Sequence, residues 1–223
     1  LGAALPTAFV SVKLARKPCD DALRRDWPWT LIKTRGEDVG LPDGTMGNSE
    51  VGHQNIGAGR IVPQESLVMT RACKDGLHTN PAIRGAIERC RLSGPGRALH
   101  LMGINSDAGV HGLLEHLYAI LGACRTLGLT ERVFIHLFTD GRDTGPYTGL
   151  AYAQQVEAKC REIGVGRVAS VAGRYYAMDR DHRWERVKLA YDTLTATSGP
   201  RAGSAAEAIQ GYYEHPSGAT LKG

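Results

Sequence analysis

Three short apolar runs carry the fold of this chain: ALHLMGI at residues 98–104, VFIHLF at residues 133–138 and VASVA at residues 168–172. A segment with helical periodicity follows each run, at residues 111–127, 149–163 and 183–195. Apolar runs of this length that alternate with amphipathic helices are typical of a parallel sheet covered by helices. The sequence therefore predicts an α/β fold with a parallel sheet.

The part of the chain before the first run is organised differently. Helical patterns are expected at residues 10–25 (broken at Pro18), 66–74 and 81–92. Residues 36–59 are irregular and rich in glycine and polar side chains, and the α/β pattern begins after Pro63. We therefore expect two partial domains, residues 1–62 and residues 63–223.

Composition limits the classes of function. Of the 223 residues, 42% are hydrophobic and 22% are charged, the formal net charge is +4 and the pI is about 8.8. Lysine and arginine are scattered, without a run of like charges, so we expect no nucleic-acid partner. No apolar stretch is long enough to span a membrane, and the first six residues lack the basic start of a signal peptide. No membrane association is expected.

The chain has five cysteines, an odd number without a C-x-x-C pair. This pattern argues against a disulfide framework and against a zinc site. Cys90, Cys124 and Cys160 stand among apolar residues of predicted helices, where cysteine packs as a small hydrophobic side chain. We therefore expect a reducing, cytoplasmic location.

A polar cluster follows each predicted strand. The clusters are NSDAGVH at residues 105–111, TDGRDT at residues 139–144 and GRYYAMDRD at residues 173–181. Ligands of open parallel sheets bind at the carboxyl ends of the strands, so the clusters should meet at one edge. Arg142, Arg174 and Arg180 would bring planar guanidinium groups there, which suit phosphate and carboxylate oxygens. The residues favour a phosphorylated organic acid as ligand, although Asp107 and Asp143 could simply serve in turns or helix caps.

The glycine-rich segment holds a second candidate site. Residues 41–60 read LPDGTMGNSEVGHQNIGAGR, with small residues around Ser49 that let a ligand approach the backbone closely. A helix beginning there would direct N–H groups at an anion. Ser49 could instead be an ordinary helix N-cap, and no neighbour is predicted to act as its base. A nucleophilic serine without a base needs another activator, usually a metal ion.

These stretches resemble those of a known family. Four strings occur in the family's order: LPDGTMGNSEVGHQNIGAGR from residue 41, SDAGVH from residue 106, DGRDT from residue 140 and GRYYAMDRDHRWERVKLAYD from residue 173. From about Ser11 onward, the chain resembles the cofactor-independent phosphoglycerate mutases of the alkaline phosphatase superfamily. The first and last strings are long enough to make a chance match negligible.

The resemblance implies a two-domain enzyme, in which an α/β substrate-binding (transferase) domain is inserted into an alkaline-phosphatase-like domain. Residues 1–62 would be a segment of the phosphatase-like domain, and residues 63–223 would be part of the transferase domain. Ser49 would be the phosphorylated nucleophile and also a ligand of two metal ions, Mn²⁺ or else Mg²⁺ or another divalent ion. The positions that match the family's substrate-binding residues are His111, Arg142, Asp143, Arg174 and Arg180.

By the same resemblance, the complete enzyme would interconvert 3-phosphoglycerate and 2-phosphoglycerate in glycolysis and gluconeogenesis. It would be an isomerase that transfers the phosphoryl group within one molecule by way of a phosphoserine. It would need no 2,3-bisphosphoglycerate, because the phosphoryl group is stored on Ser49. Phosphoglycerate would be its small-molecule partner, bound by a monomer.

The chain departs from the family's usual pattern at Ala108, Gly112, Leu113, Gly145 and His182, which are peripheral positions. The family's first metal-binding aspartate, in an Asp-Gly-Trp-Gly motif, is expected just before Leu1. Two substrate arginines and the remaining metal ligands are expected after Gly223. We therefore expect the chain to be incomplete at both ends and inactive by itself. Two alternatives stay open: a non-catalytic phosphoglycerate-binding module, and a phosphohydrolase of the same superfamily.

Overall fold

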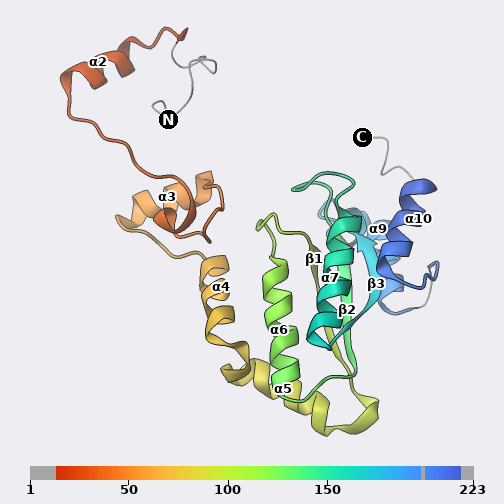
Figure 1. Ribbon diagram of the computed structural model, residues 1–223. Helices are drawn as coiled ribbons and strands as arrows, with labels where there is room; N and C mark the ends of the chain where they lie inside the picture. Colours follow the sequence, from red (N-terminus) through yellow and green to blue (C-terminus); the bar gives the residue numbers. More distant parts are fainter. Residues whose placement is uncertain (1–13, 197–198, 217–223) are drawn as a thin grey trace. The chain divides into compact units, whose positions relative to one another are not determined.

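The computed structural model describes residues 14–196 and 199–216. The chain divides into two compact units, Leu1–Pro63 and Gln64–Gly223, where the sequence pattern changes (Figure 1). The assignment of these units to a phosphatase-like and a transferase domain stays a prediction.

The second unit is built on a three-stranded sheet with the strand order β1-β2-β3. The strands are β1 (Leu99–Asn105), β2 (Val133–Thr139) and β3 (Arg167–Gly173). Both neighbouring pairs are parallel. Because each strand coincides closely with one of the three apolar runs, the predicted α/β fold with a parallel sheet is confirmed.

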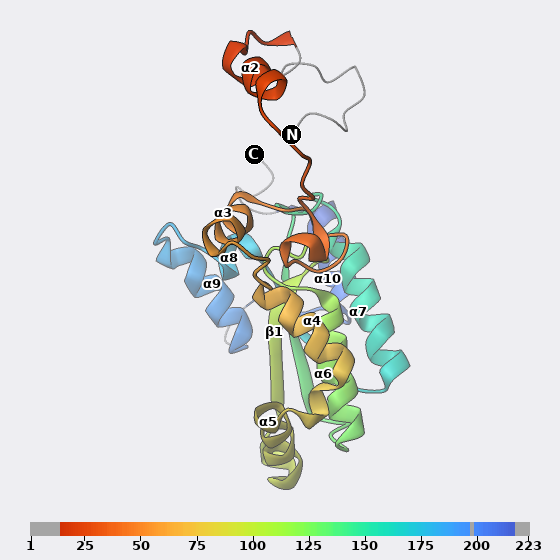
Figure 2. The same cartoon turned by 90° about the vertical axis from the view of Figure 1, so that its left-hand side faces the viewer.

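Helices cover both faces of the sheet. The connecting helices α6 (Leu114–Thr126) and α7 (Gly149–Ile163) lie on one face, and α9 (Trp184–Leu194) lies on the other (Figures 1 and 2). The three helices predicted after the strands are therefore present. α6 begins later than the predicted residue 111, because the Asp107 carboxylate accepts the N–H of Leu114 at 3.2 Å and marks the helix start there.

Two further helices are absent from the sequence-based prediction. α8 (Arg174–Ala177) is a short turn directly after β3, and α10 (Ala205–Glu214) packs against α7 and β3. The hydroxyl of Ser204 caps α10 by accepting the N–H of Glu207 at 3.0 Å. The Glu157 carboxylate of α7 accepts the N–H of Ala205 at 2.7 Å. Ser204 was the available sequence signal, since serine is a preferred N-cap residue.

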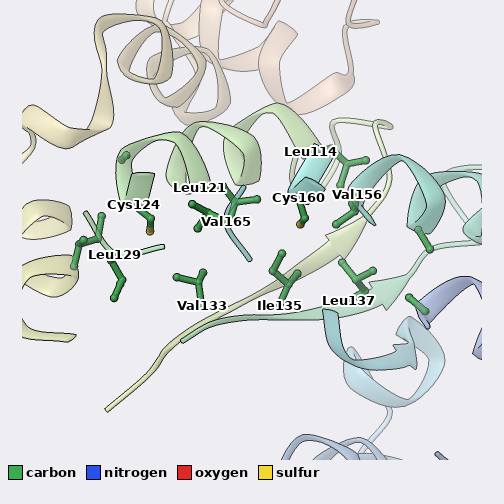
Figure 3. Close-up of a cluster of buried hydrophobic side chains, with 14 of the residues drawn as sticks. Leu114, Leu121, Cys124, Leu129, Val133, Ile135, Leu137, Val156, Cys160 and Val165 are labelled. Atoms are coloured by element: carbon green, nitrogen blue, oxygen red, sulfur yellow. The ribbon is translucent and has the colours of Figure 1, made fainter. Parts of the chain in front are cut away.

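The main core lies between the sheet and the helices α6 and α7 (Figure 3). β2 contributes Val133, Ile135 and Leu137, each at most 2% exposed. Leu121 of α6 and Val156 of α7 are fully buried against them. Burying one such side chain contributes about 1.5–3 kcal/mol, so this layer fixes the sheet on which the candidate site is built.

All five cysteines are free thiols. Cys124 and Cys160 are buried, and Cys90 packs against the same core cluster. Burial raises the pKa of the Cys124 thiol to about 11, so the thiol stays protonated at neutral pH. The prediction that these three cysteines pack as hydrophobic side chains is confirmed.

The register between β2 and β3 shifts once. The pairs around the shift are Phe134 with Arg167, Ile135 with Val168, and His136 with Ser170. Ala169 is therefore an extra residue in β3, and an extra residue turns all later side chains to the other face. Two consequences follow: Ser170 shares a face with His136, and β3 ends level with β2.

Two helices precede the sheet in the second unit: α4 (Glu65–Asp75) and α5 (Pro81–Leu92), with short 3₁₀ turns at Leu77–Thr79 and Gly94–Gly96. Both helices agree with the predicted ranges. The Thr70 hydroxyl holds α4 to α6, because it donates to Glu115 Oε1 at 3.0 Å and lies 2.8 Å from His116 Nε2. No helix in residues 14–196 and 199–216 is long and apolar enough to cross a membrane.

The first unit contains α2 (Pro18–Asp26), the 3₁₀ turn η1 (Gly36–Val39) and α3 (Ser49–Ala58). α2 begins at Pro18, where the break was expected, because proline suits the first turn of a helix. Residues 10–13 of the predicted helix lie outside the described residues. Asn55 ties the ends of the glycine-rich loop together: it donates to Val39 O at 3.0 Å and accepts the N–H of Val62 at 2.8 Å.

Candidate active site

The three strands end level with one another, which aligns the residues that follow them. Asn105 pairs with Thr139, and Thr139 pairs with Gly173. The next residues are, in strand order, Ser106, Asp140 and Arg174; we call them the strand-end row. The polar clusters therefore converge at one edge of the sheet, as expected for the carboxyl ends of parallel strands.

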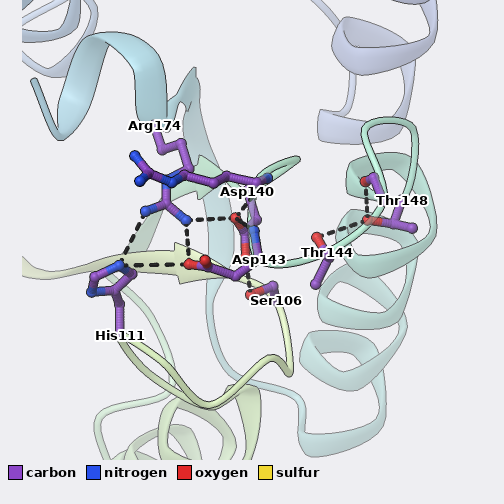
Figure 4. A network of polar contacts seen from close by, with 9 residues as sticks. Ser106, His111, Asp140, Asp143, Thr144, Thr148 and Arg174 are labelled. Atoms are coloured by element: carbon purple, nitrogen blue, oxygen red, sulfur yellow. Dashed lines mark hydrogen bonds and ion pairs between the residues drawn. The ribbon is translucent and has the colours of Figure 1, made fainter. Parts of the chain in front are cut away.

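Hydrogen bonds join the strand-end row across all three strands (Figure 4). Ser106 Oγ donates to Asp140 Oδ2 at 2.7 Å, and Arg174 Nη1 donates to Asp140 Oδ1 at 2.6 Å. The backbone N–H groups of Arg142 and Asp143 donate to the same Oδ1 at 3.1 and 3.0 Å. Asp140 is thus the centre of the row and connects it to the turn after β2.

The Asp140 carboxylate is almost completely buried, with 2% of the side chain exposed. Burial alone would raise its pKa, but the N–H groups of Asp143 and Arg142, the Ser106 hydroxyl and the Arg174 guanidinium together hold that pKa below its usual value. For Arg174, burial acts to lower the pKa, and the carboxylates of Asp143 and Asp140 raise it. Both groups are therefore charged at neutral pH.

Arg174 also connects the row to Asp143 and His111. Its Nη1 donates to Asp143 Oδ2 at 2.6 Å, and its Nη2 lies 3.0 Å from His111 Nε2. Because a guanidinium only donates, His111 Nε2 accepts this bond and the ring carries its proton on Nδ1. The contact of 3.6 Å between His111 Nε2 and Asp143 Oδ2 becomes an ion pair only when the ring is protonated. His111, Asp143 and Arg174 are thus in mutual contact.

The two aspartates that could have been simple caps behave differently. Asp107 does act at the start of a helix, through its bond to the N–H of Leu114. Asp143 does not, because its carboxylate is engaged with Arg174 and the residue before α7 is Thr148. The geometry thus separates a structural aspartate from one that lies in the charged cluster.

Arg142 and Arg180, the other two predicted substrate residues, are exposed. Arg142 is held to Asp140 through its backbone alone. Arg180 lies in a loop organised by Asp179, a second carboxylate with 2% exposure, which accepts two backbone N–H groups at 3.2 and 2.9 Å. Asp179 also accepts from the Arg186 guanidinium at 3.3 Å. Within the described residues, neither the Arg142 nor the Arg180 guanidinium has a hydrogen-bond partner.

Ser49 belongs to the first unit and is the first residue of α3. The N-cap of this helix is Asn48, whose side chain accepts the N–H of Val51 at 3.0 Å. The alternative interpretation of Ser49 as the N-cap is therefore wrong. The residue is exposed, so its hydroxyl is open to a reaction partner.

His53 lies one turn after Ser49, with its Nδ1 at 3.2 Å from Ser49 Oγ. The same Nδ1 is 2.7 Å from the carbonyl oxygen of Ser49. A carbonyl oxygen only accepts, so Nδ1 carries a proton and donates it there. A nitrogen that already carries a proton cannot remove one from the serine hydroxyl, and His53 is no general base for Ser49 in this arrangement.

Possible metal ligands do not gather in the part of the chain that the structure describes. Residues 14–196 and 199–216 contain no group of three or more His, Cys, Asp or Glu side chains that could hold a metal ion. A site for two Mn²⁺ ions needs several oxygen and imidazole ligands. The described residues therefore do not fit two metal ions by themselves, and the ligand role that the resemblance implies for Ser49 stays a prediction.

Ser106 and Asp140 receive no role in the sequence-based prediction, although both stand in the polar clusters. The signal that could have found them is their position. Each directly follows the last residue of a strand, as Arg174 does. In a parallel sheet with level ends, such residues are neighbours.

Known proteins are similar to this chain over most of its length. Residues 69–220 match the family model described as BPG-independent PGAM N-terminus. The chain is 51% identical over 215 residues to the 2,3-bisphosphoglycerate-independent phosphoglycerate mutase of Rhodopirellula baltica, a match that covers 96% of this chain and 39% of that protein. Proteins of the same name from Clostridioides difficile and Moorella thermoacetica are 49% and 50% identical, covering 90% and 92% of this chain and 38% and 39% of theirs.

A solved structure is similar as well. Leishmania mexicana phosphoglycerate mutase, determined at low cobalt concentration, matches with a TM-score of 0.72 and 33% identity over 92% of this chain and 38% of that one. The chain thus spans about two fifths of the length of the relatives it matches. Since the family model covers more than half of the residues, the chain belongs to the family described as BPG-independent PGAM N-terminus.

Proposed function

We propose that the full-length protein interconverts 3-phosphoglycerate and 2-phosphoglycerate through a phosphoserine at Ser49. The observation that carries this proposal is the contact of Arg174 with Asp143 and His111 at the carboxyl ends of the strands. Proteins about 50% identical to this chain carry the name of that activity. In this proposal the second unit holds the glycerate, and the first unit supplies the residue that carries the phosphoryl group.

The charges of the second unit suit a phosphorylated acid. Arg142 and Arg180 are exposed guanidinium groups, and they can take phosphate or carboxylate oxygens in a planar, two-bond contact. Asp143 and the neutral ring of His111 can accept and exchange hydrogen bonds with the hydroxyl groups of glycerate. Together these groups would hold glycerate while it turns between the two transfer steps.

The transfer itself is balanced within one molecule of substrate. Ser49 Oγ forms a bond to phosphorus as the bond from phosphorus to the glycerate oxygen breaks. The proton lost by the serine hydroxyl appears on the glycerate oxygen that leaves. The phosphoryl group then returns to the other hydroxyl of glycerate, and Ser49 regains a proton. Water must be excluded between the two steps, or the phosphoserine would be hydrolysed.

Activation of Ser49 is assigned to groups other than His53, because His53 Nδ1 already donates to a carbonyl. The family resemblance implies two divalent ions, Mn²⁺ or Mg²⁺, and a bound divalent ion lowers the pKa of an oxygen attached to it. Ser49 would be a ligand from this chain. The proposal also predicts no requirement for 2,3-bisphosphoglycerate, because Ser49 stores the phosphoryl group.

The proposal is tested by replacing the nucleophile. In the full-length protein with manganese, Ser49→Ala should abolish both mutase turnover and the labelling of the enzyme by ³²P-phosphoglycerate. The matched control is Ser93→Ala, which removes an exposed hydroxyl that bonds to Arg89 O at the end of α5; it should keep both. Turnover by Ser49→Ala above a few per cent of the wild-type rate would remove the assignment.

The same assay separates the other two functions. A phosphohydrolase would label Ser49 but release inorganic phosphate without producing the isomer. A binding module would bind phosphoglycerate in the presence of manganese and show neither label nor turnover. Turnover that depends on added bisphosphoglycerate would contradict the phosphoserine route.

A further inference from the structure

Asp140 is positioned to organise the candidate site without touching a ligand. Its Oδ1 accepts three N–H groups, from Arg174 Nη1 and the backbone of Arg142 and Asp143, and its Oδ2 accepts the Ser106 hydroxyl. With 2% of the side chain exposed, almost none of the carboxylate is open to a substrate. A buried charge of this kind is stable only while these bonds are made.

The bonds to Asp140 and its neighbours use one end of the Arg174 guanidinium. Both N–H groups of Nη1 are engaged, one by Asp140 and one by Asp143, and one N–H of Nη2 is engaged by His111. A guanidinium has five N–H groups, so the Nε–H and one Nη2–H have no acceptor among the described residues. His111 Nε2 and Asp143 Oδ2 are 3.6 Å apart, so they share the edge between Nη1 and Nη2. The Nε–H and the remaining Nη2–H therefore form the other edge of the fork, the arrangement that binds two oxygens of one phosphate or carboxylate.

Asp140 and Asp143 hold Arg174 in unequal ways. The Asp143 side chain is 21% exposed, so a ligand hydroxyl can replace its bond to Arg174. The Asp140 side chain is not accessible in this way. Arg174, whose side chain is 13% exposed, would keep a buried carboxylate partner while Asp143 turns to the ligand.

Asp140 also sets the turn that carries two more predicted substrate residues. Its bonds to the N–H groups of Arg142 and Asp143 close an Asx-type turn directly after β2. One buried side chain therefore connects Arg174, directly after the third strand, with Arg142 and Asp143 after the second.

We propose that Asp140 is a positioning residue for phosphoglycerate, which fixes the guanidinium of Arg174 with its free edge presented to an oxyanion and holds the Arg142–Asp143 turn beside it. Ser106 supports Asp140 through its second oxygen. The inference rests on the proposed function, because it assumes that Arg174 binds phosphoglycerate. It concerns two residues to which neither the family resemblance nor the sequence pattern assigns a role.

The test is a double-mutant cycle in the full-length protein, with 3-phosphoglycerate affinity measured by calorimetry. Asp140→Asn keeps an oxygen for the two backbone N–H groups and removes the charge that holds Arg174. We expect it to weaken binding about 10-fold, the difference between a charged and a neutral hydrogen bond. In an Arg174→Ala background, the same change should cost less than about 2-fold, because there is no guanidinium left to position.

Two more variants complete the design. Ser106→Ala keeps the charge but removes one support of Asp140, so it should weaken binding by a smaller factor that also disappears without Arg174. It serves as the second test if Asp140→Asn does not fold. The control is Glu157→Gln, a carboxylate that accepts a backbone N–H at the start of α10; it should lower the unfolding midpoint and leave the affinity unchanged.

The outcomes separate this inference from the proposed function. Equal losses with and without Arg174 would show that Asp140 acts only on general stability, and the positioning role would be wrong while phosphoglycerate binding stands. An unchanged affinity in Asp140→Asn would overturn it as well. A wild-type protein that binds no 3-phosphoglycerate would contradict the proposed function and, with it, this inference.

Discussion

Two rows of polar side chains cross the same three strands, and they differ in what they leave for a ligand. The strand-end row consists of Ser106, Asp140 and Arg174. A second, mid-sheet row consists of His100 on β1, His136 on β2 and Ser170 on β3. His136 Nε2 is 2.9 Å from His100 Nδ1, and His136 Nδ1 is 2.7 Å from Ser170 Oγ.

The mid-sheet row is centred on His136, a buried histidine with both ring nitrogens engaged. His136 is 5% exposed, and burial together with the neighbouring His100 lowers its pKa. Each ring nitrogen of His136 is bonded to one partner. The His100 ring also stacks on His136 and on Phe134, with centroids 5.2 and 5.3 Å apart. The row therefore has no spare donor at His136 for a ligand.

The strand-end row is charged and leaves donors open. Beyond the last ladder pair, the backbone N–H groups of Arg142 and Asp143 are free to bind a side chain, and Asp140 binds them. The carboxylate in turn engages only one end of Arg174. The comparison shows why the ends of the strands are the better candidate for a site. There the backbone N–H groups can fix a buried carboxylate, and the carboxylate can hold a guanidinium that keeps some of its N–H groups free.

The contrast between the two rows would be contradicted most directly if Arg174 did not bind the ligand. In the full-length protein, Arg174→Ala should weaken 3-phosphoglycerate binding by about 1.5–3 kcal/mol, the range for a hydrogen bond to a charged group. Arg142→Ala should have an effect in the same range. Lysine at either position should rescue only partly, because a point charge cannot replace the planar fork. Calorimetric titration measures all four variants.

The control for these arginines is Arg84→Ala on α5, where the guanidinium pairs with Glu88 at 2.8 Å on the surface. It should not change the affinity. Wild-type affinity in both lysine variants would show that the positive charge, rather than the planar shape of the guanidinium, determines binding. Wild-type affinity in both alanine variants would remove the strand ends as a phosphoglycerate site.

A substitution in the mid-sheet row should lower stability and leave phosphoglycerate affinity nearly unchanged. His136→Leu leaves the Ser170 hydroxyl and His100 Nδ1 without their partner, which should cost about 1–2 kcal/mol of unfolding free energy. Phosphoglycerate affinity should stay within about 2-fold of wild type. Urea unfolding with an unchanged slope measures the first quantity and titration the second. A large affinity loss in a variant of unchanged stability would mean that the two rows are not functionally distinct.

Much of this arrangement follows from sequence pattern. The apolar runs predict the three strands, and parallel strands bring their carboxyl ends to one edge, so the meeting of His111, Asp143 and Arg174 was predictable. The identity of the central residue was not. Asp140 stands in a Thr-Asp-Gly-Arg-Asp-Thr run that reads equally well as a turn, and only the register shows which aspartate is buried.

The extra residue in β3 is the physical reason that the sequence pattern alone could not predict which side chains share a row. If the pairing continued past Ile135 and Val168 without the shift, Arg174 would lie one position beyond Asp140, and Ser170 would face the opposite side of the sheet from His136. Bulges depend on packing and pairing across strands, which a local pattern does not report. Both rows therefore depend on a feature that periodicity in β3 alone does not reveal.

Ser49 shows the same limit in the first unit. Asn48 and Ser49 are both plausible N-cap residues, and the sequence does not say which of them starts the helix. The cap falls on Asn48, which leaves the Ser49 hydroxyl exposed. His53, at the spacing of one helical turn, could have been a base, but its Nδ1 donates to the Ser49 carbonyl.

The smallest expected effect is the pH dependence that His136 gives to folding. The folded protein lowers the pKa of His136 from its ordinary 6.5 through burial and the neighbouring His100, so the unfolded chain takes up a proton that the folded protein resists. The contribution to stability is complete above that ordinary pKa and is lost as the pH falls through the lower, folded value. The pKa of Asp140 also lies below its ordinary 3.8, so its contribution to stability is likewise lost as the pH falls, in a more acidic range. Wild-type unfolding free energy should therefore fall more steeply between about pH 7 and pH 5 than that of His136→Leu. Urea titrations at fixed ionic strength give both curves, and parallel curves would show that His136 titrates alike in the folded and unfolded states.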